Sequence, residues 1–312
     1  MPTPAAEIAT AARLLRAGRL VAFPTETVYG LGANALDPEA VARIYAVKGR
    51  PPTSPLIVHV ASVEMAGSLT TKWSDVADRL SSHFWPGPLT LVLEKQPAIP
   101  SIVTAGLSTV GLRVPAHPIA LALIHAAGVP LAAPSANRFT QLSPTTADHV
   151  RRGLGADVDL ILDGGPCQVG IESTVISLAG PQPVLLRPGG IARADIEAIV
   201  GPIGVTSEVA GSHPAPGMHP RHYSPRTQLL LVQNGELPNH GAGIYLQRNH
   251  LPIRSDVAIV HMPSTPAEYA VALYGILHQA DADGGDWIAV DLPPKTPEWE
   301  AIHDRLRRAS SS

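Results

Sequence analysis

Residues 20–32 read LVAFPTETVYGLG, so that a short apolar run passes at once into a polar segment rich in hydroxyl groups. Leu20–Phe23 has the length and apolar character of a buried strand. An apolar helix is expected just before it, over Ile8–Ala17, because Gly18 is a good C-terminal cap. The stretch therefore predicts the first strand of an α/β fold, with polar side chains placed after the strand ends.

A second helix is expected to begin at residues 37–39, which read DPE. They supply an N-cap, a proline at the first helical position and an acid in the first turn. Gly49 ends this helix. Lys48 and Arg50 therefore lie at a helix exit, from which long side chains can reach into a neighbouring cleft.

The alternation of strand-like and helix-like segments continues to about Val200. It predicts one α/β domain with a mixed sheet. The expected strands are Leu56–Val60, Leu89–Leu93, Val110–Val114, Val129–Ala132, Leu160–Leu162, Thr174–Leu178 and Val184–Leu186, and the expected helices are Ser74–Phe84, Ile119–Ala127 and Thr145–Arg152.

The composition changes after this domain. Gly, Pro, Ser and His dominate residues 201–227, which is typical of a linker. We divide the chain into a first domain of residues 1–203, a linker of 204–227 and a smaller α/β domain of 228–312. The second domain is expected to contain strands at Gln228–Val232, Gly243–Leu246, Val257–His261 and Trp287–Val290, and helices at Pro266–Ala280 and Glu298–Arg308.

The chain has 312 residues, of which 45% are hydrophobic and 16% charged, as in a globular protein. Its formal net charge is −3, so any nucleotide site must be a local cluster of positive charge. The single cysteine, Cys167, excludes an intrachain disulfide, fits a reducing cytoplasm and lacks the adjacent base of a nucleophile. No apolar run has transmembrane length, so we expect a soluble cytoplasmic protein without a membrane partner.

One short pattern suggests a dinucleotide site and another suggests a metal site, but the surrounding residues that either site requires are absent from the sequence. Gly30–Ala35 matches the dinucleotide pattern G-x-G-x-x-A, but residues 48–50 are KGR where an acid is expected. A phosphate-binding G-x-x-x-x-G-K-[ST] sequence is also absent. His219 and His222 are three residues apart, but Pro220 between them is unsuited to a helix and the chain lacks a thiolate pair. We therefore expect these to be solvent-exposed linker histidines.

Two arginines lie within or directly at the end of apolar strands, where an unpaired charge would be costly. They are Arg113, after Val110–Leu112, and Arg187, after Val184–Leu186. Each should pair with an acid or face an anionic ligand. Small polar groups at other strand ends can hydrogen-bond a ligand or merely form a turn, and nearby glycines let backbone N–H groups approach phosphate. Such groups are Ser135, Asn137, Ser173 and Thr174, and together with the cations they predict one anion site formed by several loops.

Four ordered motifs carry a resemblance to a known family. They are PTETVYGL at residues 24–31, KGRP at 48–51, SAN at 135–137 and GIESTV at 170–175. The motifs resemble the YrdC/Sua5 family of L-threonylcarbamoyladenylate synthases, whose Lys-x-Arg…Ser-x-Asn hallmark corresponds to Lys48, Arg50, Ser135 and Asn137. Residues 215–225 and the α/β tail make the longer, two-domain Sua5 form the closer match.

The resemblance implies a twisted mixed sheet around a positively charged hollow, a Rossmann-like second domain and a linker over the mouth of the hollow. It implies a nucleotidyltransferase that converts L-threonine, bicarbonate and ATP into threonylcarbamoyl-AMP, pyrophosphate and water, with Mg²⁺ bridging the phosphates. The product would feed formation of N6-threonylcarbamoyladenosine at position 37 of tRNA. The downstream tRNA threonylcarbamoyl-transfer machinery is thus an expected partner, and binding of tRNA itself is expected to be weak.

The resemblance also implies roles for individual residues, with no metal ligand from the protein itself. The expected catalytic group is Lys48, Arg50, Ser135 and Asn137. L-Threonine would be held by Thr27, His59, Arg113 and Ser173, with a backbone contact from Ala133. ATP would be held by Arg50, Ser54, Thr109, Ser135, Ser143 and Arg187, with Lys48 and Asn137 beside the phosphates and Tyr223 of the linker reaching back onto the nucleotide.

Two other functions stay open on the sequence alone. A basic hollow could hold RNA phosphates without catalysis, although the negative net charge and the 4% aromatic content argue against an RNA-stacking platform. A carbamoyl transferase is the second alternative, because a related domain occurs in hydrogenase-maturation proteins. The single cysteine is too few for the zinc-finger-like segments of those proteins.

Overall fold

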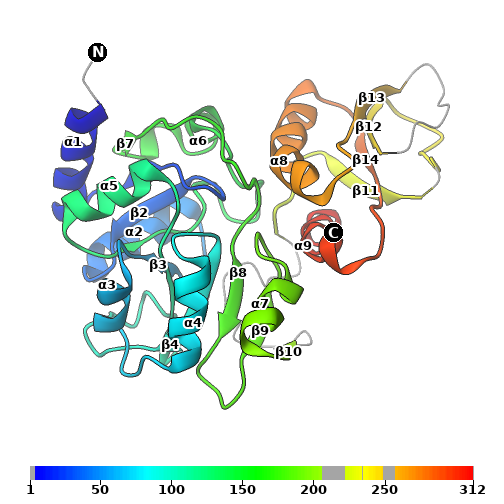
Figure 1. Ribbon diagram of the computed structural model, residues 1–312. Coiled ribbons are helices and arrows are strands. Elements are labelled where there is room, and N and C mark those ends of the chain that lie inside the picture. Colours follow the sequence, from blue (N-terminus) through cyan, green and yellow to red (C-terminus); the bar gives the residue numbers. More distant parts are fainter. Residues whose placement is uncertain (1–3, 206–221, 234, 249–256, 312) are drawn as a thin grey trace.

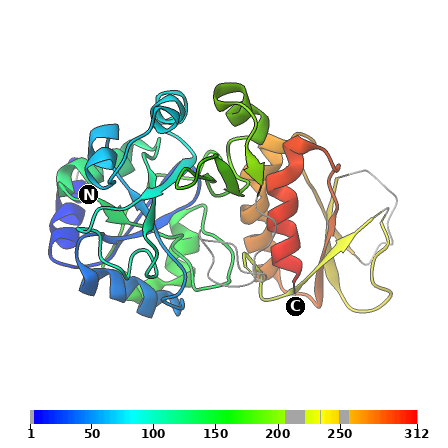
Figure 2. The same ribbon diagram turned by 90° about the horizontal axis from the view of Figure 1, so that it is seen from below.

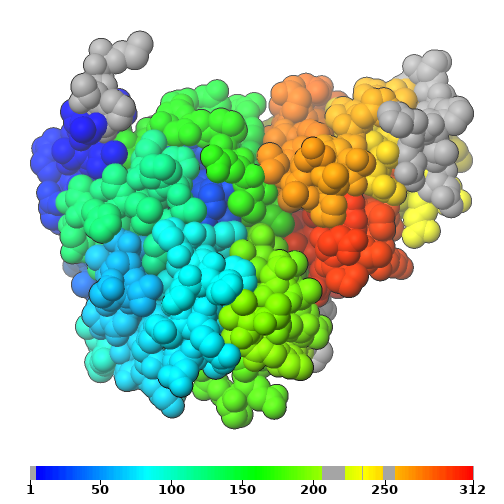
Figure 3. Space-filling model, in the orientation of Figure 1, coloured from blue at the N-terminus to red at the C-terminus, as the bar shows by residue number. Residues whose placement is uncertain are grey.

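The computed structural model describes residues 4–205, 222–233, 235–248 and 257–311. Two α/β units stand side by side (Figures 1 and 2). The helices α8 (Pro266–Asp283) and α9 (Glu300–Ser310) lie on the side of the second unit that faces the first. Figure 3 shows the surfaces of the two units in contact. No helix in the described part of the chain is long and apolar enough to cross a membrane.

Within the described residues, the first unit is built on a ten-stranded sheet in the order β10-β9-β8-β4-β5-β3-β6-β2-β1-β7. The sheet is mixed, as predicted, because β3 pairs parallel with β5 whereas β4 pairs antiparallel with it. The strands are β1 (Val21–Phe23), β2 (Gly30–Asn34), β3 (Ile57–His59), β4 (Leu89–Glu94), β5 (Thr109–Arg113), β6 (Leu131–Ala132), β7 (Leu160–Ile161), β8 (Thr174–Ser177), β9 (Val184–Arg187) and β10 (Gly204–Val205).

Helices cover this sheet. Apolar side chains of α1 and α5, among them Leu15 and Leu123, are buried in one cluster with Val21 of β1. The helices are α1 (Pro4–Arg16), α2 (Pro38–Lys48), α3 (Val63–Ser68), α4 (Asp75–Phe84), α5 (Pro118–Ala127), α6 (Ala147–Gly153) and α7 (Arg193–Val200), with a short 3₁₀ turn η1 (Gly155–Asp157).

Helix α2 begins and ends as the sequence predicts. The Asp37 carboxylate accepts hydrogen bonds from the backbone N–H groups of Glu39 and Ala40, at 3.0 and 3.2 Å. Gly49 closes the helix in the left-handed conformation, with φ of 62°. The chain therefore leaves the helix at Arg50, whose side chain bonds Ser54 and Pro55 just before β3.

The glycine-rich segment that matched the dinucleotide pattern lies in strand β2 and not in a phosphate-binding turn. β2 pairs antiparallel with β1. A Cβ on Gly32 would lie 2.7 Å from Cε1 of Phe23, so glycine is needed here for close packing inside the sheet. This finding agrees with the rejection of a dinucleotide site, although the strand itself was not predicted.

The second unit is a parallel α/β layer. Its strands β11 (Gln228–Val232), β14 (Trp287–Asp291), β12 (Gly243–Gln247) and β13 (Ala258–His261) lie in that order and are parallel throughout. Helix α8 follows β13, and a 3₁₀ turn η2 (Pro297–Trp299) leads from β14 into α9. The arrangement confirms the predicted α/β second domain.

The two units share one hydrophobic cluster. Val28, Leu142 and Ile171 of the first unit are buried together with Leu273 and Leu277 of α8. The apolar face of α8 therefore covers polar loops of the first unit, including residues 24–29, which connect β1 to β2. This contact places the second unit directly against the candidate site.

Some elements were not predicted from the sequence. Besides β2, they are the short helices α3 and α7 and the strand β10, which pairs with β9 and extends the first sheet to Val205. Most of the expected linker, including residues 215–218, lies outside the described residues. Within the linker, His222, Tyr223 and Ser224 are described, and all three are buried.

We expect Gly170→Ala to destabilise the contact between the units. Gly170 has a φ of 78°, and an added Cβ would lie 2.4 Å from the carbonyl oxygen of Ala270 in α8. Backbone strain and the clash together should lower the thermal unfolding midpoint by about 2–4 °C or more, measured by differential scanning calorimetry.

Gly67→Ala is the matched control. Gly67 lies in α3, and apart from its own helix nothing would lie within 4 Å of an added Cβ. The alanine should leave the midpoint unchanged or raise it slightly, because glycine inside a helix costs roughly 0.5–1 kcal/mol relative to alanine. Equal midpoints for Gly170→Ala and the native chain would contradict the close approach of α8.

Candidate active site

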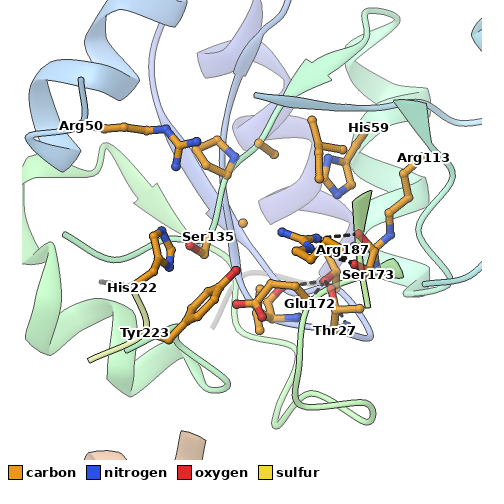
Figure 4. A pocket seen from close by; sticks show the side chains of 16 residues that line it. Thr27, Arg50, His59, Arg113, Ser135, Glu172, Ser173, Arg187, His222 and Tyr223 are labelled. Carbon is orange, nitrogen blue, oxygen red and sulfur yellow. Dashed lines mark hydrogen bonds between the residues drawn. The ribbon is translucent and has the colours of Figure 1, made fainter. Parts of the chain in front are cut away.

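One pocket of the first unit gathers side chains from many separate elements (Figure 4). It encloses about 530 Å³ that protein atoms do not occupy, part of which is open to solvent. The predicted site residues that line it are Thr27, Arg50, His59, Arg113, Ala133, Ser135, Ser173, Arg187 and Tyr223. Loops and strand ends far apart in the sequence therefore meet at one place, as the scattered motifs predicted.

The register of two strands directs two of these side chains. His59 ends β3, Arg113 ends β5, and the two residues lie opposite each other in a parallel pair. Side chains at opposite positions of neighbouring strands point to the same face of a sheet. Both side chains therefore reach the pocket, as Figure 4 shows.

Arg50 is a buried cation whose contacts are all with uncharged groups in the described chain. It is 6% exposed, and its guanidinium donates hydrogen bonds to the Ser54 hydroxyl and to the carbonyl oxygens of Ser54 and Pro55. Among the described residues, Arg113 has an acidic partner but Arg50 has none. Burial lowers the pKa of Arg50 to about 10, which leaves it charged at neutral pH.

Arg113 pairs with an acid, which is one of the two alternatives predicted for it, and its facing an anionic ligand stays a prediction. Its Nη2 lies 2.6 Å from Oε1 of Glu26, its Nε donates to the carbonyl oxygen of Gly87 at 3.2 Å, and it also lines the pocket. The second Glu26 oxygen accepts a 3.0 Å hydrogen bond from the backbone N–H of Ala116. Removing one partner of such a buried pair typically costs about 3–5 kcal/mol.

Arg187 and Ser173 are joined by several hydrogen bonds. The Nε and Nη2 atoms of Arg187 donate to the Ser173 carbonyl oxygen at 3.2 and 2.8 Å, and Nη2 also donates to the Ser173 hydroxyl at 3.1 Å. The same hydroxyl lies 2.8 Å from Oγ1 of Thr90. The positions of these two pocket residues are therefore interdependent.

His59 is a buried and neutral member of the site. Burial, together with the charge of Arg113, lowers its pKa to about 3. Its Nδ1 is buried without a hydrogen-bond partner among the described residues, which is unusual for a polar atom in a protein interior. A ligand in the pocket is a natural partner for this atom.

Lys48 and Asn137 lie behind the pocket wall. The Lys48 ammonium donates to the carbonyl oxygens of Ser135 and Asn137, both at 2.6 Å, and to Oδ1 of Asn137 at 3.3 Å. Burial, with the charge of Arg50, holds the pKa of Lys48 well below its usual value. In this structure Lys48 anchors the loop that carries Ser135, and the expected contact of Lys48 and Asn137 with phosphate stays a prediction.

Three other predicted residues surround the pocket without lining it. Ser54 is buried against Arg50, and the Ser143 hydroxyl donates to Oε1 of Glu172 at 2.6 Å. Thr109 lines a smaller adjoining pocket, which shares Ile57 with the main one.

Ala133 was expected to offer a backbone contact. Its N–H already donates to the carbonyl oxygen of Ile57 at 2.9 Å. A ligand contact through the Ala133 amide would therefore have to replace this bond.

The expectation that His222 is solvent-exposed is wrong. It is 4% exposed, lines the pocket, and its ring lies 5.7 Å from that of Phe139 and 4.0 Å from that of Tyr223. Its backbone N–H donates to the carbonyl oxygen of Arg308 at 3.3 Å, which draws the linker inward. His219 lies outside the described residues, within which no group of three metal-ligating side chains occurs.

Tyr223 of the linker lines the pocket, and its expected contact with the nucleotide stays a prediction. It is buried and has a positive φ of 61°, which is uncommon for a residue other than glycine. In Figure 4 its ring points into the pocket, beside Ser135 and His222. The linker backbone therefore takes an unfavourable conformation at the point where it contributes to the pocket wall.

Sequence reasoning missed two carboxylates, Glu26 and Glu172. Glu26 pairs with Arg113, and Glu172 lines the pocket. Both lie inside the motifs quoted above. Glu26 stands between Thr25 and Thr27, and Glu172 stands between Ile171 and Ser173. The signal that could have found them is the need of the buried arginines for acidic partners.

Cys167 is buried, and burial raises the pKa of its thiol to about 12, in agreement with the view that it is not a nucleophile.

Comparison with known proteins identifies the family. Residues 13–189 match the Sua5/YciO/YrdC family model, described as telomere recombination, and residues 191–311 match a model described as the C-terminal domain of threonylcarbamoyl-AMP synthase. The chain belongs to the Sua5/YrdC family. The join between the two matches falls after β9, so that the second match includes α7 and β10 of the first sheet.

The relatives are similar over nearly their whole length. The threonylcarbamoyl-AMP synthase of Pyrococcus abyssi is 49% identical, with 97% of this chain and 94% of that protein covered. That of Bacillus subtilis is 42% identical, with 97% and 93% covered. The crystal structure of P. abyssi Sua5 complexed with L-threonine superimposes with a TM-score of 0.90 at 39% identity, covering 98% of this chain and 94% of that one.

We expect His59 to stay neutral across the physiological range. Because its pKa is lowered to about 3, the imidazole resonances of His59 should not titrate between pH 8 and pH 5 in an NMR experiment. The unfolded chain takes up this proton near pH 6.5, so His59 lowers the stability of the fold as the pH falls below that value. Free imidazole added to the sample is the reference for the pH scale. A His59 midpoint near 6.5 would contradict its burial beside Arg113.

Proposed function

We propose that this protein is an L-threonylcarbamoyladenylate synthase, which forms threonylcarbamoyl-AMP, pyrophosphate and water from L-threonine, bicarbonate and ATP. The observation that carries the proposal is the buried, charged Arg50 guanidinium, which faces the pocket without an acidic partner in the described chain. Such a charge is costly unless an anion compensates it. The names of the relatives, and the L-threonine bound by P. abyssi Sua5, favour ATP and threonine over other ligands.

L-Threonine is proposed to bind beside Arg113 and His59. A guanidinium binds carboxylates through its N–H donors, and since Nε and Nη2 of Arg113 already contact Gly87 and Glu26, the threonine carboxylate would use the remaining donors. The neutral His59 ring can offer its unpartnered Nδ1 to the hydroxyl or amino group of the substrate. Thr27 and Ser173 bring hydroxyl groups to the same pocket.

ATP is proposed to bind on the side of Arg50, Arg187 and Ser135. The two guanidinium groups would neutralise phosphate charge, and Lys48 would act from behind by fixing the Ser135 loop. Tyr223 would cover the nucleotide from the linker side. The smaller pocket with Thr109 adjoins this region and is lined mainly by apolar side chains.

Mg²⁺ is proposed to enter as part of the substrate, bound to the phosphates of ATP. The carboxylates near the pocket do not form a metal site, because Glu26 pairs with Arg113 and both Glu172 oxygens accept hydrogen bonds. The described residues contain no cluster of metal-ligating side chains. When bound, the ion would supply charge neutralisation and geometry for the phosphates.

The chemistry requires two anions to meet. Threonine and bicarbonate must first form a carbamate, whose oxygen attacks the α-phosphorus of ATP as pyrophosphate leaves. Buried cations held in place by the fold can stabilise the charge of both partners, so positioning and electrostatics would supply most of the catalysis. His59 is too weak a base to remove a proton at neutral pH and would act by orienting the substrate. His222 and Tyr223 would keep water away from the labile carbamate.

The product would serve N6-threonylcarbamoyladenosine formation in tRNA, and the enzyme would hand it to the downstream transfer machinery. An RNA-binding module without catalysis is less well supported. The cations that could contact phosphate are buried inside a pocket, whereas an RNA backbone needs an exposed basic surface.

Arg50→Ala should reduce turnover by about 10²–10³-fold, the usual effect of losing one preorganised charge in a reaction centre. Arg50→Lys should also be impaired, because lysine lacks the planar fork. Release of pyrophosphate is the measurement, and circular dichroism verifies the fold. Arg13→Ala, which changes an exposed arginine of α1, is the control and should keep native turnover. Near-native turnover of Arg50→Ala would contradict a role of Arg50 in catalysis.

Arg113→Lys should chiefly raise the KM for threonine. Lysine keeps a positive charge beside Glu26, so the fold should survive, but it cannot form the fork to a carboxylate. Arg113→Ala is a poorer test because it leaves Glu26 buried and unpaired. A threonine KM equal to that of the native chain in steady-state kinetics would argue against the carboxylate contact.

The direct test is mass spectrometry of a reaction with the purified protein, ATP, Mg²⁺, L-threonine and bicarbonate. Threonylcarbamoyl-AMP with pyrophosphate, absent when threonine is omitted, is the expected result. Intact ATP in the presence of folded protein would overturn the proposal as stated, and tRNA binding with steep salt dependence would then favour the RNA-binding alternative.

A further inference from the structure

Glu172 is an acidic side chain in the wall of the pocket, and the second unit binds it. Its Oε1 accepts the 2.6 Å hydrogen bond from the hydroxyl of Ser143. Its Oε2 accepts a 3.1 Å hydrogen bond from the hydroxyl of Tyr274 and a 2.7 Å hydrogen bond from Nε of Arg305. Tyr274 lies in α8 and Arg305 in α9, so partners from the second unit hold a carboxylate of the first unit's site.

Arg305 is itself held firmly. It is 1% exposed, and its Nη1 donates to Oδ2 of Asp304 at 2.7 Å, while Oδ1 of Asp304 accepts a 3.0 Å hydrogen bond from Arg308. The guanidinium carbon of Arg305 lies 5.1 Å from the ring centre of Tyr223, which lines the pocket. Arg305 therefore contacts both the Glu172 carboxylate and the part of the linker that completes the wall.

The backbone at Glu172 transmits its position to the site. Ser173 follows directly and accepts the hydrogen bonds from Arg187. The loop after Arg187 packs onto the same turn, because Gly190 N–H donates to the Glu172 carbonyl oxygen at 3.1 Å and a Cβ on Gly189 would lie 2.4 Å from that oxygen. A displacement of Glu172 would therefore move Ser173 and Arg187 with it.

The charge of Glu172 matters because the pocket has to admit a polyanion. Burial acts to raise the pKa of Glu172, but Arg305 and Arg187, with the hydrogen bond from Ser143, outweigh burial and hold the pKa below its usual value. The carboxylate is therefore ionised at neutral pH. Without Arg305, this negative charge in the wall would repel the phosphates.

We propose that Arg305 and Tyr274 are positioning residues for ATP, which neutralise and orient Glu172 so that the second unit completes the nucleotide half of the pocket. The inference rests on the proposed function, because it takes ATP as the anion. A contact that merely joined the two units would stabilise the fold and leave ATP affinity unchanged. Binding and stability therefore separate the two roles.

The first test compares two tyrosines of α8. Tyr274→Phe removes the hydroxyl that bonds Glu172, whereas Tyr269→Phe removes a buried hydroxyl that has no hydrogen-bond partner among the described residues. Calorimetric titration with ATP and Mg²⁺, without threonine, should show a Kd raised about 3- to 10-fold for Tyr274→Phe and unchanged for Tyr269→Phe. Both variants should unfold within a few degrees of the native chain.

The second test uses charge compensation. Arg305→Met should raise the Kd for ATP more than tenfold, because Glu172 then loses the arginine that bonds it directly. Glu172→Gln added to Arg305→Met should recover much of the affinity, since the repelling charge is gone. The recovery distinguishes an electrostatic role from loss of packing, which the second substitution would not repair.

The outcomes keep this inference apart from the proposed function. Native ATP affinity in Tyr274→Phe, or no recovery in the double variant, would overturn the positioning role while product formation by the native chain would still establish the synthase. Product formation failing in the native chain, with ATP affinity changing as described, would overturn the synthase but keep the positioning of an ATP site.

Discussion

The burial of positive charge is the constraint on which this structure depends. Arg50, Arg113 and Arg187 are all withdrawn from water around one pocket, where each charge must be compensated. Arg113 pairs with Glu26, and the Glu172 carboxylate interacts with Arg187, whereas the contacts of Arg50 in the described chain are with uncharged groups. The positive charge of Arg50 is therefore not neutralised by an acidic group of the described chain. An anionic substrate would stabilise this charge better than water can.

Local chemistry explains how much of this could be predicted. The cap and the stop of α2, Asp37 and Gly49, each adjoin the helix end that they define, and the apolar runs of β3 and β5 define their own strands, so these elements follow from short-range patterns. The elements that were missed depend on tertiary contacts. Strand β2 is stabilised by pairing and by the fit of Gly32 against Phe23, and α3 is too short for a clear period.

The site shows the same division. The residue types gathered at the pocket were predicted from motifs, but their partners were not, because those contacts join distant parts of the chain. Lys48 bonds a residue 87 positions away, and Glu172 is bound by Arg305, 133 positions away. His222 lies in a segment whose composition indicates exposure, yet the linker backbone is held against α9. The composition of a segment indicates whether it tends to be exposed, whereas the burial of a residue depends on tertiary contacts with distant parts of the chain.

The pairing of β3 with β5 has a consequence for how such a chain can change over evolutionary time. His59 and Arg113 occupy opposite positions of one ladder, and a shift of either strand by one residue would turn its side chains to the other face. An insertion or deletion inside either strand would thus turn one of these side chains away from the pocket without altering any residue of the motifs. We therefore expect length variation in the connections between strands, and only replacements of one residue by another within β3 and β5.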